Sequence, residues 1–501
     1  MHSLYVIVTL SVAWLALCVV MWRLHRSRLD SVLEPNASIL ITYASQTGNA
    51  QAIAKRCATA LNISETSSVI ALNALTLEHL TNIEKILFVV STYGDGEAPD
   101  NGSLFTKLAK ILSSKKLTNL QYSVIALGDS EYPEFCAFGY QINQTMLNAG
   151  AQSMGNVITV DNYNEQTTKL ASITPDWIKI EHELTLNPEI KPLQYWQLTK
   201  REVLNPDCND AKLFQLSFSS IGPFPCWQAG DLLDIQPQQP HDIVERWLLE
   251  NNLNGNMWLT HQGHQQSLRT WLLTRELPKA CPHSVDELLN ELPYLHKRSY
   301  SVASISQEGQ LELIVRLVEK NDVGVPEIDY GLTSGFLSHY CQVGSIIEGQ
   351  IRDVSSHHHI DQSKPMILIG AGSGLAGLKA QIAARNFSVQ KQVGKIWLIF
   401  GERNSSPLLP INQQLSSLQE TQLTKLSCAY SKDVQYPKYV QDILLNEKNI
   451  LKQWLDDGAV IYVCGSLTGM GESVHQTLIE VLGQSSVEEL QLQQRYIRDV
   501  Y

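Results

Sequence analysis

The chain has 501 residues, of which 44% are hydrophobic and 18% charged, and a formal net charge of −12. This length predicts about three domains, and the composition excludes a disordered protein. The acidic balance argues against nucleic acid as a partner, because phosphate backbones require clustered Lys and Arg. Nine unpaired-looking cysteines favour a reducing compartment over a disulfide framework or a structural zinc site.

The first predicted element is the uncharged stretch Leu4–Trp22, followed by Arg23, Arg26 and Arg28. As a helix it would be about 28 Å long, close to the roughly 30 Å core of a bilayer. We expect residues 1–30 to form a transmembrane signal anchor, with a cleaved signal peptide as the alternative. By the positive-inside rule, the remainder would lie in the cytoplasm.

Residues 38–182 predict an α/β domain that begins with the strand Ser38–Ala44, the loop SQTGNA and an amphipathic helix. A hydroxyl- and glycine-rich loop before a helix N-terminus can hold a phosphate, although a simple capped turn would have the same pattern. Two further strands, Lys85–Ser91 and Tyr122–Gly128, run into polar loops that carry Tyr93 and Tyr132. Because carboxyl ends of parallel strands converge, these two aromatics could sandwich a flat ring.

The same loops are acidic, and this predicts either a solvated face or a docking surface for a basic redox partner near that ring. The acidic residues are Asp95, Glu97, Asp100, Asp129, Glu131 and Glu134.

Residues 190–361 predict short strands such as Lys212–Ser219, interrupted by a helical insert at 242–292. The string RSYS (298–301) and the glycine-hydroxyl turn GLTSGFL (331–337) together suggest a diphosphate site. Residues 362–501 return to α/β, with a glycine-rich loop between the strand and helix of Met366–Arg385. Three more strands follow, at 395–404, 426–433 and 459–466. The last contains Cys464, which could equally be a buried structural thiol.

In order along the chain, these motifs resemble the diflavin reductase family. ITYASQTGNA, STYGDGE and LGDSEY are similar to its flavodoxin-like FMN domain, and RSYS, GLTS, GAGSG, FGER, YSKD, YVCG and RDVY to its ferredoxin–NADP reductase module. The resemblance implies a flavodoxin-like doubly wound domain, an FAD-binding β-barrel with a short helical insert, and a C-terminal NADP-binding α/β domain. It implies FMN, FAD and NADPH as cofactors.

The resemblance also assigns residues to each cofactor. It implies that the FMN phosphate is held by Ser45, Gln46, Thr47, Gly48 and Asn49, and that the isoalloxazine is flanked by Tyr93 and Tyr132, with Gly94 beside them. The residues similar to FAD contacts are Arg298, Tyr300, Ser301, Gly331, Leu332, Thr333 and Ser334. Those similar to NADPH contacts are Gly372, Ser373, Arg403, Ser431, Lys432, Tyr439 and Gln441, with Ser431 and Lys432 at the 2′-phosphate. Ser301, Cys464 and Asp499 resemble the polar set at the hydride-transfer site, and Tyr501 resembles an aromatic lid over FAD.

Some positions depart from the family pattern. The loop that often carries a proline and an arginine has Gly377 and Lys379 instead, and Pro437 replaces a lysine near the 2′-phosphate site. Since Lys432 is a point charge rather than a fork, the preference for NADPH over NADH could be weak. The triplet His357–His359 lacks spaced partner ligands, and we expect no metal site.

The sequence therefore predicts a membrane-anchored NADPH-dependent diflavin reductase that passes electrons through FAD and FMN to an external acceptor, most plausibly a hemoprotein. Three alternatives remain open: the flavoprotein subunit of a sulfite reductase, a reductase of ferric chelates or quinones, and a non-catalytic flavin-binding scaffold.

Overall fold

The computed structural model describes residues 38–45, 48–92, 96, 98–130, 134–161, 163, 168–178, 193–208, 212–261, 264–278, 288–290, 292–320, 329–354, 360–388 and 392–501. The predicted membrane segment Leu4–Trp22 lies outside these ranges. Within them, no helix has both the length and the apolar composition needed to cross a membrane. The chain divides into two compact units, Met1–Glu189 and Ile190–Tyr501.

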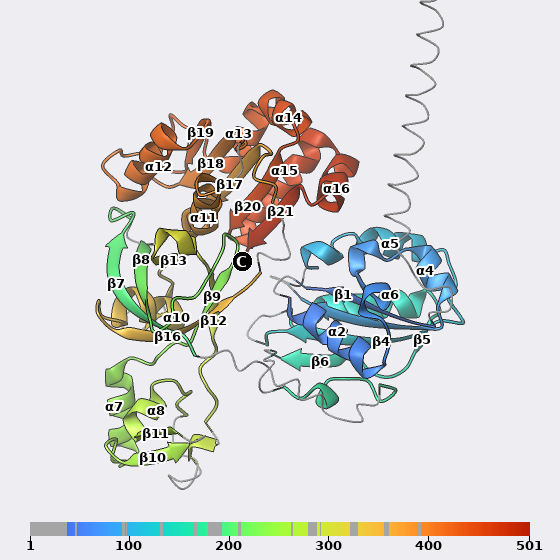
Figure 1. Ribbon diagram of the computed structural model, residues 1–501, viewed down its shortest axis with the longest axis horizontal. Helices are drawn as coiled ribbons and strands as arrows, with labels where there is room; N and C mark the ends of the chain where they lie inside the picture. The colour runs from blue at the N-terminus through green and yellow to red at the C-terminus, as the bar shows by residue number, and fades with distance from the viewer. Residues whose placement is uncertain are drawn as a thin grey trace, which may run out of the picture. The chain divides into compact units, whose positions relative to one another are not determined.

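The first unit is built on one parallel sheet with the strand order β2-β1-β3-β4-β5, in which β6 also pairs with β4 (Figure 1). Its strands are β1 (Ile39–Ala44), β2 (Val69–Ala71), β3 (Lys85–Ser91), β4 (Gln121–Gly128), β5 (Gln152–Ser153) and β6 (Ile158–Asp161). Its helices are α2 (Asn49–Ala60), α3 (Glu65–Ser68), α4 (Leu77–Asn82), α5 (Phe105–Leu112) and α6 (Ala137–Asn148), with short 3₁₀ segments η1 (Leu72–Ala74), η2 (Asp100–Gly102) and η3 (Leu170–Ser172). This is the doubly wound order of flavodoxin-like folds.

Helices cover both faces of this sheet, and the strand sequences show why. Alternate residues of each strand enter two separate cores: Leu40 and Phe88 pack with α5 and α6, whereas Ile41 and Leu87 pack with α2. A strand buried on both faces needs apolar residues at nearly every position, and so the strands appear in the sequence as continuous apolar runs.

The second unit begins with an antiparallel sheet in the order β12-β9-β16-β7-β8-β13. A bridge between Val302 and Leu313, and a 2.7 Å hydrogen bond from the Ala303 N–H to the Glu312 carbonyl, join the end strands and close a barrel. The strands are β7 (Tyr195–Val203), β8 (Leu213–Ile221), β9 (Leu232–Ile235), β12 (Arg298–Ser301), β13 (Leu311–Arg316) and β16 (Ile346–Arg352); a small ribbon pairs β14 (Glu319–Lys320) with β15 (Asp329–Tyr330). The helical segments here are η4 (Ser306–Glu308), α10 (Leu332–Gly335) and the π-helical η5 (Phe336–Tyr340).

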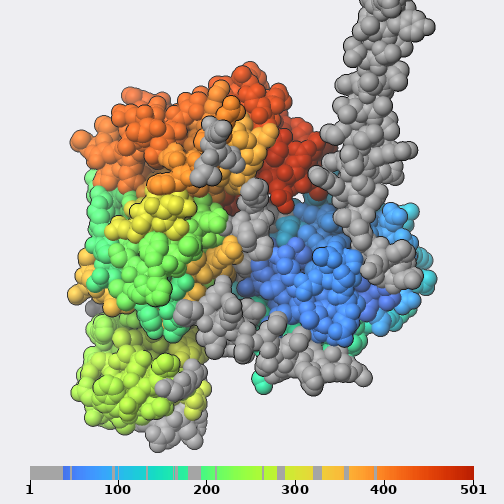
Figure 2. All heavy atoms as spheres, in the orientation of Figure 1, coloured from blue at the N-terminus to red at the C-terminus, as the bar shows by residue number. Residues whose placement is uncertain are grey.

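The insert differs from the helical stretch predicted at 242–292. It contains α7 (His241–Glu250) and α8 (Leu268–Leu272), but an antiparallel hairpin of β10 (Trp258–His261) and β11 (His264–Ser267) separates them. Figure 2 shows this insert as a yellow-green lobe beside the barrel. The short run of Trp, Leu and Thr after a glycine-containing turn favours a strand over a helix.

A second parallel sheet, with the order β19-β18-β17-β20-β21, forms the last part of the chain. Its strands are β17 (Met366–Ala371), β18 (Ile396–Glu402), β19 (Lys425–Tyr430), β20 (Val460–Gly465) and β21 (Tyr496–Val500). The helical segments are η7 (Gly372–Gly374), α11 (Leu375–Asn386), α12 (Pro410–Thr421), α13 (Val440–Asn446), α14 (Lys448–Asp456), η8 (Leu467–Gly471), α15 (Glu472–Leu482) and α16 (Gln484–Leu492). Strand order reverses between β17 and β20, which is where such sheets bind ligands.

This sheet and its helices lie directly against the barrel, as the orange-to-red and green surfaces of Figure 2 show. One link between them is the half-buried ion pair of Lys379 on α11 with Glu312 on β13, at 2.9 Å. Both predicted α/β folds, the doubly wound sheet of the first unit and the C-terminal parallel sheet, are confirmed.

Candidate functional site

The predicted phosphate loop of the first unit connects β1 to α2. Gly48 adopts the left-handed conformation (φ 83°) immediately before the helix, where a side chain would be strained. The Ser45 hydroxyl accepts the Ala50 N–H at 3.1 Å, and the Ser45 N–H donates to Asn101 Oδ1 at 2.8 Å. Asn49 opens the helix, whereas Gln46 and Thr47 lie outside the described residues. A left-handed glycine before a helix N-terminus suits a phosphate.

The predicted aromatic positions Tyr93, Gly94 and Tyr132 also lie outside the described residues, but the strand ends that lead to them are described. The Thr92 N–H donates to the Leu127 carbonyl at 2.8 Å, so the loops after β3 and β4 begin side by side. Ser130 donates from its N–H and hydroxyl to the Asp161 carboxylate, at 2.9 and 2.6 Å. The carboxyl ends of β3, β4 and β6 are thus tied together.

Strand β12 divides the predicted FAD residues between two faces. Arg298 and Tyr300 pair with the barrel-core residues Ile235 and Leu233, and Tyr300 packs against that core. Burial raises the pKa of the Tyr300 phenol, so it remains a hydrogen-bond donor at neutral pH. Ser301 lies on the opposite face, buried toward the nucleotide-binding sheet.

The turn Gly331–Ser334 is tightly built. The Ser334 hydroxyl donates to the Gly331 carbonyl and accepts the Val318 N–H, both at 3.2 Å, and Leu332 begins α10. A Cβ at Gly331 would lie 2.9 Å from Ser334 Oγ. The buried Thr333 hydroxyl has no partner among the described residues. An unpaired buried hydroxyl is costly, and it fits a place where a bound diphosphate would complete the hydrogen bonding.

In the second parallel sheet, the backbone of the glycine-rich loop after β17 lies in close contact with β20. A Cβ at Gly374 would lie 2.0 Å from the Cys464 carbonyl oxygen, and Gly372 has a positive φ of 57°. The Tyr501 hydroxyl donates to Ser373 Oγ at 2.9 Å, and the residue as a whole is 53% exposed. The Tyr501 N–H donates to the Gly465 carbonyl at 3.0 Å, and the Tyr501 carbonyl accepts the Leu467 N–H at 2.9 Å. Any movement of this ring is therefore a side-chain rotation.

Three residues predicted for hydride transfer come together although they are distant in sequence. Asp499 pairs with Cys464 in the β20–β21 register. Its Oδ2 accepts from the Ser301 hydroxyl at 3.0 Å and from the Cys464 thiol at 3.4 Å. Burial and the Asp499 carboxylate raise the pKa of the Cys464 thiol, so it stays protonated and neutral.

Sequence reasoning missed two residues at this edge. The Tyr462 hydroxyl also donates to Asp499 Oδ2, at 2.9 Å. The second is Arg316, at the end of β13. A Cβ added at Gly372 would lie 2.0 Å from Arg316 Nη2, so the Arg316 guanidinium lies on the glycine-rich loop. Tyr462 is two residues before Cys464 and therefore shares its face of the strand, which was a usable signal. Arg316 comes from the barrel and gave none.

The predicted adenosine-phosphate residues lie at the ends of β18 and β19. Backbone hydrogen bonds from Ser431 to Glu402 (3.0 Å) and from Lys432 to Arg403 (2.9 Å) bring Arg403 beside the Ser431–Lys432 pair. Tyr439 caps α13, which also contains Gln441, and the Lys438 ammonium lies 5.3 Å from the Tyr439 ring centroid. Hydrogen bonds from Ser405 and the Gln435 backbone lower the pKa of Asp433, which places an anion next to Lys432.

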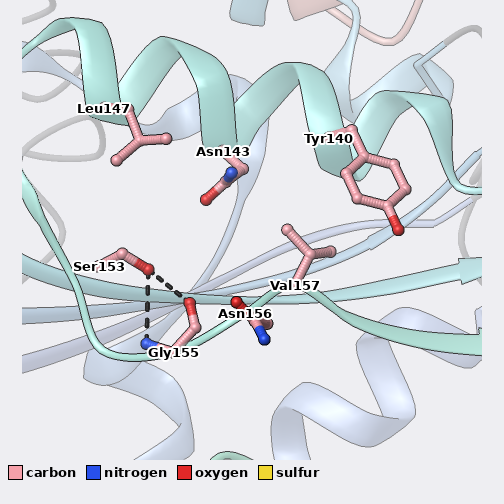
Figure 3. Close-up of a pocket in the computed structure, with 7 residues that line it drawn as sticks. All are labelled: Tyr140, Asn143, Leu147, Ser153, Gly155, Asn156 and Val157. Carbon is pink, nitrogen blue, oxygen red and sulfur yellow. Dashed lines mark hydrogen bonds between the residues drawn. The ribbon is translucent and has the colours of Figure 1, made fainter.

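Two other features stand apart from these sites. A shallow groove between α6 and the turn after β5 is lined by Tyr140, Asn143, Leu147, Ser153, Gly155, Asn156 and Val157 (Figure 3). Ser153 is paired with Tyr122 at the start of β4, so the groove is remote from the carboxyl strand ends. His357–His359 lie outside the described residues, and the described residues contain no His, Cys, Asp or Glu cluster suited to a metal.

A flavodoxin-like domain, a β-barrel and a second parallel sheet with a glycine-rich loop, all in one chain, are typical of flavin-dependent oxidoreductases. Comparison with known proteins agrees: the flavodoxin family matches residues 41–174, and the oxidoreductase NAD-binding domain family matches residues 368–476. The sulfite reductase [NADPH] flavoprotein alpha-component of Vibrio cholerae is 27% identical, over 95% of this chain and 90% of its own length. That of Bacillus subtilis is 25% identical, over 92% and 89%. The two domain matches and these relatives fit the diflavin reductase family that the sequence motifs predicted.

These matches support the cofactor set predicted from the sequence, namely FMN, FAD and NADPH. The residues present fit these groups: a left-handed glycine before α2, an unpaired buried hydroxyl at Thr333, and a glycine-rich loop at a strand end on which the Arg316 guanidinium lies.

Proposed function

We propose that this chain is an NADPH-dependent diflavin reductase whose two flavin domains relay electrons to a separate hemoprotein. One observation supports the reaction with NADPH most directly. Ser301 and Cys464 both donate hydrogen bonds to Asp499. These hydrogen bonds join the barrel, where FAD is expected, to the strand ends where nicotinamide is expected. When bound, the cofactors supply two-electron acceptance from NADPH and one-electron delivery to the acceptor.

The residues have distinct roles in this proposal. Ser301 and the neutral Cys464 thiol orient the nicotinamide, and the Asp499 carboxylate stabilises the positive charge that develops on it. Tyr501 would cover the flavin face until the nicotinamide displaces its ring. Arg403, Ser431 and Lys432 would hold the 2′-phosphate, with Arg316 near the diphosphate.

For the acceptor, the comparisons favour the sulfite reductase type over a membrane cytochrome. The Vibrio cholerae and Bacillus subtilis relatives are both named as flavoprotein components of sulfite reductase. The partner would dock on the acidic loops of the flavodoxin-like domain. Of the predicted acidic residues, the described side chains are Asp129 and Glu134; Asp95, Glu97, Glu131 and the side chain of Asp100 lie outside the described residues.

The uncharged run Leu4–Trp22 favours the second candidate, a membrane-anchored hemoprotein reductase facing the cytoplasm. Cell fractionation of the full chain and of a variant lacking residues 1–30 tests it. The full chain should sediment with membranes and the truncated one should not; recovery of both in the supernatant would contradict the anchor.

Titration of the purified protein with NADPH and with NADH tests the function itself. NADPH should bleach the flavin absorbance, and NADH should do so at higher concentrations; no bleaching by either would leave only the scaffold alternative. Acceptor assays with a sulfite reductase hemoprotein, a membrane cytochrome, cytochrome c and ferric chelates then separate the candidates. Reduction of small chelates alone would contradict a hemoprotein acceptor.

A further inference from the structure

Three donors from two parts of the second unit converge on one oxygen of Asp499. Its Oδ2 accepts from Ser301 at 3.0 Å, from Tyr462 at 2.9 Å and from Cys464 at 3.4 Å. Tyr462 is the donor to which the motifs assigned no role. It is buried, and its phenol lies on the face of β20 that packs against α11.

Helix α11 makes its closest approach to this cluster at Gly377. An added Cβ there would lie 2.8 Å from Cys464 Sγ, 3.0 Å from Asp499 Oδ2 and 3.1 Å from the Tyr462 hydroxyl. The Gly377 N–H lies near the Cys464 thiol. The proline that often occupies this position in the family would lack that N–H, and its Cβ would crowd Cys464 Sγ, at 2.8 Å.

One turn further along α11, the side chain of Gln381 is buried beside the Tyr462 phenol. Gln381 therefore supports the side of Tyr462 that faces the helix, while the Tyr462 hydroxyl donates to Asp499. An ionised carboxylate only accepts hydrogen bonds, and so each donor on Oδ2 fixes its orientation while leaving its charge in place. Networks of this kind in a buried setting hold a unique geometry.

We propose that Tyr462, supported by Gln381, is a positioning residue that fixes the Asp499 carboxylate in the orientation required for hydride transfer. The proposal rests on the proposed function. In that reaction a hydride leaves C4 of the reduced nicotinamide for the flavin, and the ring becomes the cationic NADP⁺. A carboxylate stabilises this charge only if it is oriented before the charge develops.

Tyr462→Phe in the full chain, loaded with both flavins, tests the proposal. In stopped-flow measurements, the rate of flavin bleaching by NADPH should fall about 10-fold, as expected for one lost hydrogen bond to a charged group. Flavin content and the NADP⁺ affinity measured by calorimetry should stay unchanged. The charge-transfer absorbance that NADP⁺ forms with the dithionite-reduced protein should weaken, because it reports how the nicotinamide lies on the flavin.

Tyr496→Phe is the matched control, since it removes another buried phenol of the same sheet, one bonded to His475 and not to Asp499. It should bleach at the wild-type rate. Gln381→Leu keeps the tyrosine and should slow bleaching about threefold, so the proposal remains testable if Tyr462→Phe does not fold. The proposal would be overturned if either folded variant bleached at the wild-type rate. It would also be overturned if weaker NADP⁺ binding accounted for the slower bleaching. Absence of bleaching in the wild type would instead overturn the proposed function.

Discussion

The two parallel sheets of this protein begin in the same way and use the shared motif differently. In both, the first strand runs through a glycine-containing loop into a helix: β1 leads to α2, and β17 leads to α11. In the first unit, the loop is organised by hydroxyl and amide side chains, with Ser45 bonded to the Ala50 N–H and to Asn101. In the second sheet, glycines let the loop backbone contact β20, with no room for a Cβ at Gly374.

The two loops differ because the N-termini of α2 and α11 have different neighbours. The α2 loop contacts its own helix and the neighbouring strand-end loop that carries Asn101, and under the proposed function it would hold a phosphate there. The start of α11 must also reach across to β20, so that Gly377 contacts the Cys464–Asp499 pair that Ser301 joins from the barrel. Similar topology thus supports one site made of strand-end loops and another assembled from three elements.

The largest effect should come from adding a methyl group to each loop. Gly374→Ala places a Cβ 2.0 Å from a backbone carbonyl, which cannot move aside like a side-chain tip, so we expect a loss of more than about 3 kcal/mol of unfolding free energy. Gly48→Ala meets the penalty of a left-handed residue, about 1–2 kcal/mol. Urea unfolding of both variants measures this difference. Equal losses would contradict the contrast between the loops.

The next effect concerns the cross-domain site. Ser301→Ala and Asp499→Asn should each slow flavin reduction by NADPH, Asp499→Asn by about 100-fold, because a preorganised charge is lost. FMN content should not change, since no residue of the first unit is altered. Ser427→Ala removes a serine hydroxyl of the same sheet that bonds to Trp397 and Glu447, and should reduce flavin at the wild-type rate. A wild-type rate in Asp499→Asn would contradict the assigned site.

A smaller effect is expected at Tyr501, whose ring would compete with the nicotinamide under the proposed function. Tyr501→Ala should tighten coenzyme binding about 10-fold, the equivalent of a lost stacking contact and its hydrogen bond to Ser373. It should also narrow the difference between NADPH and NADH. Titration calorimetry with NADP⁺ and NAD⁺ measures both changes. Tyr501→Phe, which keeps the ring, is the control; unchanged affinities in Tyr501→Ala would contradict a lid.

The smallest effect is a pH dependence of the unfolding free energy that comes from the buried thiol of Cys57 in the first unit. Burial raises the pKa of Cys57 in the first unit from 9.0 to about 12. The folded state therefore keeps this proton, and the stability it contributes is full below pH 9 and is lost as the pH rises toward 12. At half a unit above the thiol pKa of the unfolded chain, the loss should be about 0.8 kcal/mol. Unfolding at two pH values checks it; Cys57→Ala should show a smaller loss than the wild type.

The sequence alone determined the elements that depend on local pattern. The runs Lys85–Ser91, Tyr122–Gly128 and Met366–Arg385 predicted β3, β4 and the β17–α11 motif to within a residue or two, because a strand buried on both faces requires a continuous apolar run. The order of motifs was enough to predict the family and its cofactors. In the insert, the same local approach failed, since the β10–β11 pairing depends on a partner strand rather than on composition.

Only the tertiary structure decided which side chains meet. Strand alternation places Ser301 on the face opposite Tyr300, and the motif resemblance grouped it with Asp499. Only the structure shows that Ser301 hydrogen-bonds to Asp499, a residue 198 positions later. A tyrosine within an apolar strand is expected to be a core residue, and Tyr462 is buried. Its proposed function depends on the β20–β21 register and on the close approach of α11 at Gly377. Register and helix approach are set by packing between distant segments, and such contacts leave no periodic trace in the sequence.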